Sequence, residues 1–398
     1  MDDSASKAAA LDSKGALPTD FAGNVKTSEP QQVLSLFDAI ALIVGIVIGA
    51  GIFSFPSLVA GNTGSAALFM GLWILGGVVS LIGAMCYAEL ATTFPSAGGD
   101  YHFLKRAFGN RLAFLFAWAR MTIIQTGSVA ILAFVFGDYA SQFYNLGEFS
   151  PMFYAALIIS VMTIINIIGI QFGAGAQKLL TILQILGIFA IIAAGFFFAP
   201  AETAAPATTS SGNSSVSIGL AMVFVLLTFG GWNEAAYISA EMRRGSRQIA
   251  RALIGGIFII TALYVLINLA YLNVLGLNGV AASQTVASDV MRLTFGEGAA
   301  ALIGLLAAIA ALSSINATIF TGARTNYALG RDFPLFTLLG RWNARADAPI
   351  NAFIVQGVIS LALVGLGMWT REGIQTIVDY AAPVFWFFFL LVGVALFV

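Results

Sequence analysis

The sequence predicts an all-α polytopic membrane protein, and three observations lead to that fold class. Of the 398 residues, 59% are hydrophobic and only 9% are charged, and the mean hydropathy is +0.92. Soluble domains carry about 25% Asp, Glu, Lys and Arg, so this composition excludes a soluble enzyme. The charged residues also leave long apolar segments uninterrupted, and the basic residues alternate between the two sides of the predicted membrane.

The charged and sulfur-containing residues exclude further classes of function. Eighteen Lys and Arg against nineteen Asp and Glu give a net charge of −1, which offers no basic surface for a nucleic acid. One cysteine, Cys86, and one histidine, His102, cannot form an internal disulfide or a multi-histidine metal site. We therefore expect no cofactor apart from a coupling ion, Na⁺ or H⁺.

Ten hydrophobic segments are long enough for membrane helices, which need about 20 residues each. Residues 1–34 are rich in Ala, Ser and Asp and lack the apolar core of a signal peptide, so we expect a disordered cytoplasmic tail. No residue from Ala39 to Ala88 is charged, and the polar break at 61–64 divides this stretch into two spans. The ten predicted spans are 36–60, 66–93, 112–137, 152–171, 177–199, 217–240, 251–276, 299–325, 350–369 and 376–398.

Basic residues predict the orientation, because Lys and Arg accumulate in short cytoplasmic loops. Twelve lie in loops on one side, against only Arg292 and Arg371 on the other. This asymmetry predicts a multi-pass protein of the cell membrane with a cytoplasmic amino terminus. The chain stops inside a helix at Val398 without a polar anchor, so we expect a fragment whose remaining helices are missing. The twelve residues are Lys105, Arg106, Arg111, Lys178, Arg243, Arg244, Arg247, Arg251, Arg324, Arg331, Arg341 and Arg345.

Two predicted spans contain glycine clusters that should interrupt the helix. The first span carries Gly45, Gly49 and Gly51, and each glycine costs about 1 kcal/mol of helix propensity relative to Ala. The sixth span carries the pair Gly230-Gly231 at a comparable depth. Glycines also permit close helix packing, which is an alternative explanation for the first cluster. Breaks at matching positions in two halves favour a transporter site built on an inverted repeat.

The paired breaks divide the chain into two five-helix halves. The first half covers 35–199, an extracytoplasmic loop covers 200–216, and the second half covers 217–398. Exposed N–H groups at the start of a half-helix can hold a carboxylate, and exposed carbonyl oxygens can accept an ammonium group or coordinate a cation. An α-amino acid carries both groups, so a zwitterion is the substrate that these breaks favour.

Several motifs in order support this interpretation by their resemblance to a known family. The glycine segment at 45–53 is followed by Phe55-Pro56, then by 86–90 (CYAEL), 94–101 (FPSAGGDY), 229–233 (FGGWN) and 241–244 (EMRR). From about residue 35 to its end, the chain resembles the amino acid, polyamine and organocation (APC) superfamily of secondary transporters. The segment at 230–233 is most similar to the L-type amino acid transporter branch and its bacterial relatives.

The resemblance implies a five-plus-five inverted-repeat fold of the leucine-transporter type, often with two further helices, and alternating access around spans 1 and 6. It places the substrate carboxylate on the backbone of Ala50 and Gly51, and Phe229 or its neighbours at a gate. Relatives commonly have Ser or Thr where this chain has Ala50, so a hydroxyl contact is lost there. The substrate-binding residues implied are Val47, Ile48, Gly49, Ala50, Gly51, Leu227, Thr228, Phe229, Gly230 and Gly231.

Energy coupling could use a proton or a sodium ion. Gln184 stands where many relatives place a lysine, which puts lysine-based coupling in doubt, and Asn233 and Glu234 after the second break are further coupling candidates. The resemblance also implies a sodium site with oxygen ligands, the type that hard cations require. Its serines could instead only hydrogen-bond between helices. The sodium-site residues are Gly45, Ile48, Ala310, Ser313 and Ser314.

Three other ionisable residues lie near the predicted spans. Arg120 lies about eight residues into the third span, where we expect it either to snorkel to the cytoplasmic surface or to form a gate ion pair. Glu89 at a helix end is expected to anchor that end at the interface. His102 lies in a short amphipathic stretch that we place on the cytoplasmic interface.

The sequence therefore predicts a secondary active transporter of amino acids, with neutral L-amino acids favoured, and not an enzyme. A transporter of polyamines or organic cations is the alternative. An ion channel is less favoured, because neither a filter sequence nor a charged pore ring is present. The expected partners are the small-molecule substrate and the lipid bilayer, and the sequence leaves a partner protein open.

Overall fold

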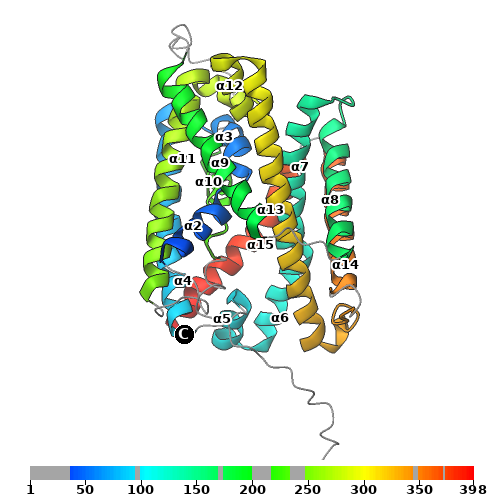
Figure 1. The fold of residues 1–398 in the computed structure, drawn as a ribbon. Helices are drawn as coiled ribbons and strands as arrows, with labels where there is room; N and C mark the ends of the chain where they lie inside the picture. Colours follow the sequence, from blue (N-terminus) through cyan, green and yellow to red (C-terminus); the bar gives the residue numbers. More distant parts are fainter. Residues whose placement is uncertain are drawn as a thin grey trace, which may run out of the picture.

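The computed structural model is a bundle of helices (Figure 1). It describes residues 36–94, 99–168, 174–199, 217–233, 247–343, 348–370 and 373–398. Within these ranges regular structure is helical, apart from one isolated pairing between Asn343 and Ala348. The α-helices are α2 (Leu36–Val47), α3 (Gly51–Gly61), α4 (Ala66–Thr93), α5 (Gly99–Phe108), α6 (Asn110–Ala119), α7 (Gln125–Phe143), α8 (Ser150–Ile168), α9 (Ala174–Phe197), α10 (Ile218–Thr228), α11 (Arg247–Ala282), α12 (Val286–Phe295), α13 (Glu297–Asp332), α14 (Ile350–Thr370) and α15 (Gly373–Val394).

The predicted all-helical, multi-span membrane architecture is confirmed. Seven helices of the described part are long and apolar enough to cross a membrane, and three shorter apolar helices accompany them. Each of the ten predicted spans contains helix. The seven run over Ala66–Thr93, Asn110–Phe143, Ser150–Ile168, Gln248–Ala282, Glu297–Asp332, Ile350–Gly367 and Ile374–Phe397, and the shorter three over Gly51–Gly61, Ile182–Phe197 and Ile218–Thr228.

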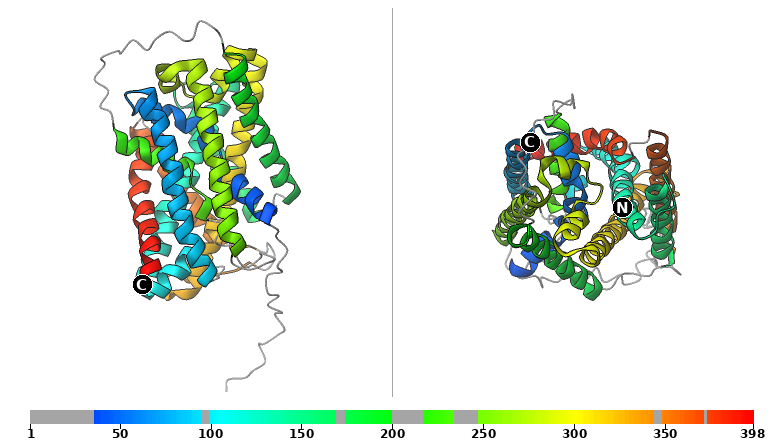
Figure 2. Two further views of the ribbon diagram at one scale, coloured as in Figure 1. Left: turned by 90° about the vertical axis from the view of Figure 1, so that its left-hand side faces the viewer. Right: turned by 90° about the horizontal axis from the view of Figure 1, so that it is seen from above.

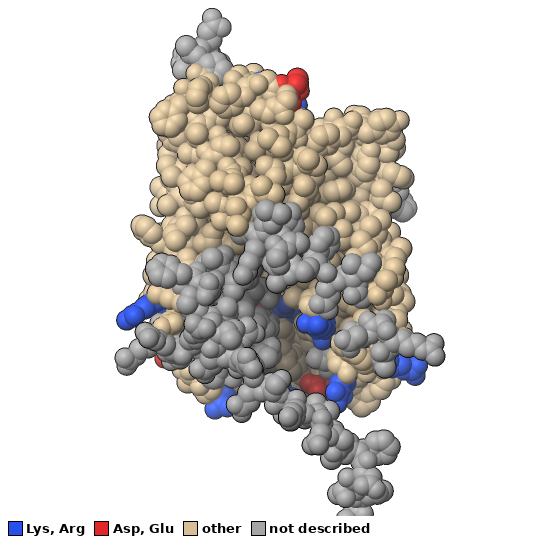
Figure 3. All heavy atoms as spheres, viewed as in Figure 1, with Lys and Arg blue, Asp and Glu red and all other residues tan. Residues whose placement is uncertain are grey.

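Two surfaces of different composition follow from this architecture. The side of the bundle carries exposed apolar residues such as Ile74, Ile82 and Phe258, as expected for side chains that face lipid. On the face shown in Figure 3, the uncovered surface of the upper half carries no charge apart from the end at the top, and Lys and Arg lie towards the end where α5 and α6 lie. The interior is filled by aromatic side chains, including Trp73 and Tyr264, which are both fully buried.

Helices distant in the sequence pack along one another. Figure 2 shows α4 beside α11, and Gly77 on α4 makes this approach possible, since a Cβ there would lie 2.4 Å from the Thr261 side chain. Gly276 has φ 65° and interrupts α11, so its regular part ends where the seventh span was predicted to end.

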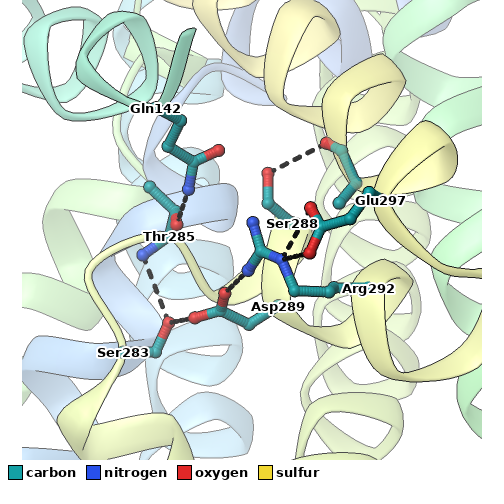
Figure 4. Close-up of polar contacts among 8 residues, drawn as sticks. Gln142, Ser283, Thr285, Ser288, Asp289, Arg292 and Glu297 are labelled. Carbon is teal, nitrogen blue, oxygen red and sulfur yellow. Dashed lines mark hydrogen bonds and ion pairs between the residues drawn. The ribbon is translucent and has the colours of Figure 1, made fainter. Parts of the chain in front are cut away.

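The segment 277–298, which connects the predicted spans 251–276 and 299–325, contains the helix α12. Ser283 Oγ donates to Asp289 (2.5 Å), and Arg292 donates to Asp289 and, through Nε, to Glu297 (2.9 Å) at the start of α13 (Figure 4). The hydrogen bond with Glu297 raises the pKa of Arg292. Hydropathy alone did not reveal α12, because the helix is short and carries charged residues. Its apolar face packs into the protein, where Val286 and Val290 are fully buried.

The helix α5 is the second element that was not predicted as a span, and it is the amphipathic stretch that contains His102. The Tyr101 hydroxyl donates to Asp332 at the end of α13 (3.0 Å). Burial, with a contribution from this hydrogen bond, raises the pKa of Tyr101 to about 12. Arg106 lies over the ring of Phe94, 4.1 Å from its centroid. These contacts hold α5 against the ends of α4 and α13.

We predict that close packing at Gly137 is essential to the pairing of α7 with α8. A Cβ at Gly137 would lie 2.0 Å from the carbonyl oxygen of Pro151, so Gly137→Ala must move backbone. Overpacking of this kind costs about 1–3 kcal/mol, and the thermal unfolding midpoint in detergent should fall. Gly71→Ala on α4 is the control, because a Cβ there meets nothing within 4 Å. Equal midpoints for the two variants would contradict the prediction.

Candidate functional site

The first predicted helix break is present between α2 and α3. The α2 helix ends at Val47, α3 begins at Gly51, and the residues between them are not helical. The Gly49 N–H donates to the Val47 carbonyl (2.8 Å) instead of continuing the helix. Ala50, at the N-cap of α3, supplies no side-chain hydrogen bond to the first turn. An uncapped helix start presents N–H groups and positive partial charge, which suit a carboxylate.

The second predicted break follows α10, which ends at Thr228. The Gly230 N–H turns back to the Leu227 carbonyl (3.1 Å), and Gly231 adopts φ 106°. A side chain at Gly231 would be strained in this conformation, so the glycine is a requirement of the break itself. The predicted continuation to residue 240 and Glu234, the proton-coupling candidate, lie outside the described residues.

A single tyrosine on α11 joins the two breaks. The hydroxyl of Tyr264 lies 3.1 Å from the carbonyl oxygen of Val47 and 3.1 Å from that of Thr228. One hydroxyl hydrogen therefore serves the carboxyl ends of both α2 and α10. The ring is fully buried and packs against Phe229, with centroids 4.9 Å apart, and against Trp73, with centroids 5.9 Å apart. Packing thus fixes the hydroxyl between the two helix ends.

Two other tyrosines hold the start of α3. Pro56 has no N–H, so the Ile52 carbonyl loses its partner one turn later in α3. The Tyr271 hydroxyl donates to that carbonyl (3.3 Å), and the Tyr139 hydroxyl donates to the Phe53 carbonyl (2.7 Å). The first turn of α3 is therefore bonded to both α11 and α7.

A cavity of about 510 Å³ lies between the two breaks and the helices α6, α7, α13 and α15. Its lining includes Asp100 on α5, and no described residue of α12. The cavity therefore extends from the breaks towards the end of the bundle where α5 lies. Predicted residues that line it are Gly45, Val47, Gly49, Ala50, Gly51, Leu227, Thr228, Gly230, Gly231, Asn233, Ser313 and Ser314.

Four predicted residues do not line this cavity. Ile48 is 1% exposed, and Phe229 and Ala310 are fully buried, so all three belong to the packed interior. Phe229 belongs to the second break, and its ring packs against the rings of Trp73 and Tyr264. Gln184 is buried on α9, away from the cavity lining.

The structure brings one of the two sodium-site serines close to the first break. A Cβ on Gly49 would lie 3.3 Å from Ser314 Oγ, so the hydroxyl faces the interrupted segment. Ser313 and Gly45 line the same cavity, whereas Ile48 and Ala310 are buried beside it.

Arg120 lies inside the protein and does not snorkel to the surface. It is 5% exposed, lines the cavity, and places Nη1 3.9 Å from a carboxylate oxygen of Asp100. Of the two alternatives raised by the sequence, the ion pair is therefore the one found. Arg120 also opens a π-helical turn, Arg120–Ile124, between α6 and α7. Wide turns of this type frequently occur at functional sites.

Comparison with known proteins identifies the family. The profile described as amino acid permease matches residues 34–398, which is most of the chain. The chain belongs to this family. The human b(0,+)-type amino acid transporter 1 is 30% identical over 375 residues, which cover 92% of this chain and 75% of the relative. The mouse large neutral amino acids transporter small subunit 2 is 28% identical over 378 residues, which cover 89% of this chain and 68% of the relative.

Sequence reasoning missed the residues of the permease that hold the breaks in place. Tyr264, Tyr271 and Tyr139 lie within apolar helices, where an isolated tyrosine gives no signal of its role. Asp100 was part of a quoted motif, but its approach to Arg120 depends on how α5 folds back beside α6. Only helix packing shows that these side chains meet the site.

We predict that Tyr264→Phe weakens substrate binding by this permease. Loss of the hydroxyl removes the shared hydrogen bond to the Val47 and Thr228 carbonyls, and a buried hydrogen bond contributes about 1 kcal/mol. Because Tyr264 holds both helix ends in the geometry that binds substrate, loss of about 1 kcal/mol of this preorganisation should raise the half-saturation concentration about fivefold. Tyr154→Phe on α8 is the control, because its hydroxyl donates to the Tyr144 carbonyl (2.8 Å) outside the cavity. Equal half-saturation in the wild type and Tyr264→Phe would refute the assigned role.

Proposed function

We propose that this permease is a secondary active transporter of amino acids, with neutral L-amino acids as its main substrates. The observation that carries the proposal is the meeting of two interrupted helices at one cavity. The uncapped start of α3 faces it at Gly51, and the ends of α2 and α10 face it at Val47 and Thr228. The b(0,+)-type amino acid transporter among its relatives supports amino acids as substrates, and the large neutral amino acids transporter small subunit supports neutral ones.

The chemistry of the breaks suits a zwitterion. The N–H groups at Ala50 and Gly51 would bind the carboxylate, and the carbonyl groups at the other helix ends would accept the ammonium group. The Val47 carbonyl already accepts two hydrogen bonds, from the Gly49 N–H and the Tyr264 hydroxyl. The Leu227 carbonyl accepts one such bond, from the Gly230 N–H, and the Thr228 carbonyl accepts one, from Tyr264, so each keeps a lone pair for the ammonium group. Backbone binding of this kind needs no charged side chain at the breaks.

We further propose a five-plus-five inverted repeat that works by alternating access in the cell membrane. The cavity extends towards α5, near the basic residues that positive-inside topology assigns to the cytoplasm. In this orientation the amino terminus is cytoplasmic and the described conformation is open towards the cytoplasm. The network of α12, shown in Figure 4, would then close the opposite side.

Coupling to sodium is the proposed energy source. Ser314 Oγ faces the first break and Ser313 lines the cavity, which supports an oxygen-lined cation site between α13 and the end of α2. Asn233 and Glu234 are the candidates for proton coupling instead, and Gln184 cannot carry a proton as a lysine would.

Counterflow into proteoliposomes tests the transport function. Vesicles with purified permease are loaded with unlabelled neutral, cationic or acidic amino acids, and entry of a labelled amino acid is followed. Saturable accumulation with neutral amino acids is expected. Folded protein that accumulates no amino acid would contradict the proposal, and a response to polyamines would favour the organic-cation alternative.

Replacing sodium with choline tests the coupling ion. Uptake should fall when sodium is removed, and Ser314→Ala should raise the sodium concentration needed for half-maximal uptake. Ser160→Ala on α8 is the control, since that hydroxyl donates to the Ala156 carbonyl of its own helix (2.8 Å). Uptake that is unchanged in choline would exclude sodium coupling.

A further inference from the structure

Gln125 on α7 borders the cavity with both of its amide hydrogens already donated. Its Nε2 donates to the Thr318 carbonyl (3.0 Å) and to the Thr321 hydroxyl (3.0 Å), both on α13. A carbonyl can only accept, so the nitrogen of the amide must be the atom that faces α13. Gln125 can therefore offer a ligand only its side-chain carbonyl oxygen, which is a hydrogen-bond acceptor.

Three hydroxyl groups beside Gln125 have also donated their hydrogens. Ser128 donates to the Ile124 carbonyl (2.9 Å) on α7. On α13, Thr318 donates to the Ser314 carbonyl (2.8 Å) and Thr321 to the Ala317 carbonyl (3.0 Å). Each hydroxyl has a single hydrogen, so while it keeps this bond it offers a ligand only lone pairs, and Thr321 already uses one of its lone pairs to accept from Gln125. We name this set, Gln125, Ser128, Thr318 and Thr321, the acceptor wall; all four line the cavity.

The packing behind Gln125 holds the acceptor wall in this arrangement. A Cβ at Gly322 would lie 2.6 Å from Gln125 Cγ and 2.6 Å from Gln356 Oε1, so only glycine leaves room for both amides. Gln356 on α14 donates to the same Thr318 carbonyl (3.3 Å). A hydroxyl that turned its hydrogen towards a ligand would leave a backbone carbonyl of its helix without that bond.

We propose that the acceptor wall selects amino acids whose side chains carry an O–H or N–H donor, such as Thr, Asn and Gln. This inference rests on the proposed amino acid transport. A donor on the substrate meets the lone pairs of the wall, whereas an apolar side chain removes their water without replacing its hydrogen bonds. A carboxylate would place its lone pairs against those of the wall. Val378, Ala381 and Ala382 on α15 line the cavity as well and suit the hydrocarbon part of the side chain.

Competition by isosteric amino acids tests the acceptor wall. Proteoliposomes with the full chain take up labelled threonine by counterflow, and inhibition constants are measured for unlabelled Thr against Val and Asn against Leu. A site built for donors discriminates against the apolar isostere by at least about tenfold. Glutamate should likewise compete less well than glutamine. Equal inhibition by Thr and Val in the wild type would overturn the inference.

Two variants locate the discrimination in the wall. Thr318→Val and Gln125→Met keep the side-chain volume and remove polar atoms, and each should bring the Val-to-Thr ratio of inhibition constants towards one. Thr122→Val, in the π-helical turn between α6 and α7, is the matched control; the Thr122 hydroxyl makes the same type of bond, to the Trp118 carbonyl (2.9 Å), and Thr122 does not line the cavity. Folding of each variant is checked by gel filtration, and Thr318→Val alone suffices if Gln125→Met does not fold. A Val-to-Thr ratio of inhibition constants in folded Thr318→Val that equals the wild-type ratio would also overturn the inference.

The outcomes separate this inference from the transport function. If no amino acid enters the vesicles, the transport function is overturned and this inference with it. If amino acids enter without discrimination between Thr and Val, only the role of the acceptor wall is overturned.

Discussion

The interior of a membrane provides no water for backbone polar groups, and the two helix breaks of this permease depend on that constraint. An interrupted helix is stable there only if its exposed groups are bonded by the protein or face a cavity. Here both occur: Tyr264 bonds the Val47 and Thr228 carbonyls, and Gly49, Gly230 and Gly231 line the cavity. The buried ring cluster of Trp73, Phe229 and Tyr264 places the hydroxyl where this bonding is possible.

The same constraint explains how the cavity can be polar with so few charges. Hydroxyl groups on α7 and α13 donate to carbonyls one turn earlier in their own helices, so they satisfy their hydrogens without a partner across the cavity. Their lone pairs remain available on the cavity side. Arg120 and Asp100, in contrast, approach each other at the end of the cavity near α5, where two charges share one buried environment. Among the described residues that line the cavity, Asp100 and Arg120 are the charged ones.

Much of the fold could be predicted from the sequence, because each membrane helix satisfies its own backbone and needs only a long apolar segment. All ten predicted spans contain helix, and the glycines at 49–51 and 230–231 lie at the two breaks. The helix α12 was missed because it is not a long apolar segment. It has only ten residues, two of which are the charged Asp289 and Arg292, so a search for hydrophobic segments does not find it. The resemblance implied a gate at Phe229 or its neighbours, and that role stays a prediction; the position of the buried Phe229 ring beside Trp73 and Tyr264 depends on helix packing that the sequence does not show.

The sequence by itself determined the ten membrane spans, their two breaks and the family, since these depend on local composition, glycine positions and the order of motifs. Only the tertiary structure decided which groups meet at the site. The bond from Tyr264 to Val47 joins residues 217 positions apart, and that from Gln125 to Thr318 joins residues 193 positions apart. Such contacts depend on how the helices pack side by side. The sequence of one helix does not show which other helix its polar side chains will contact. The hydrogen-bonding character of the cavity is therefore a property of the packed bundle.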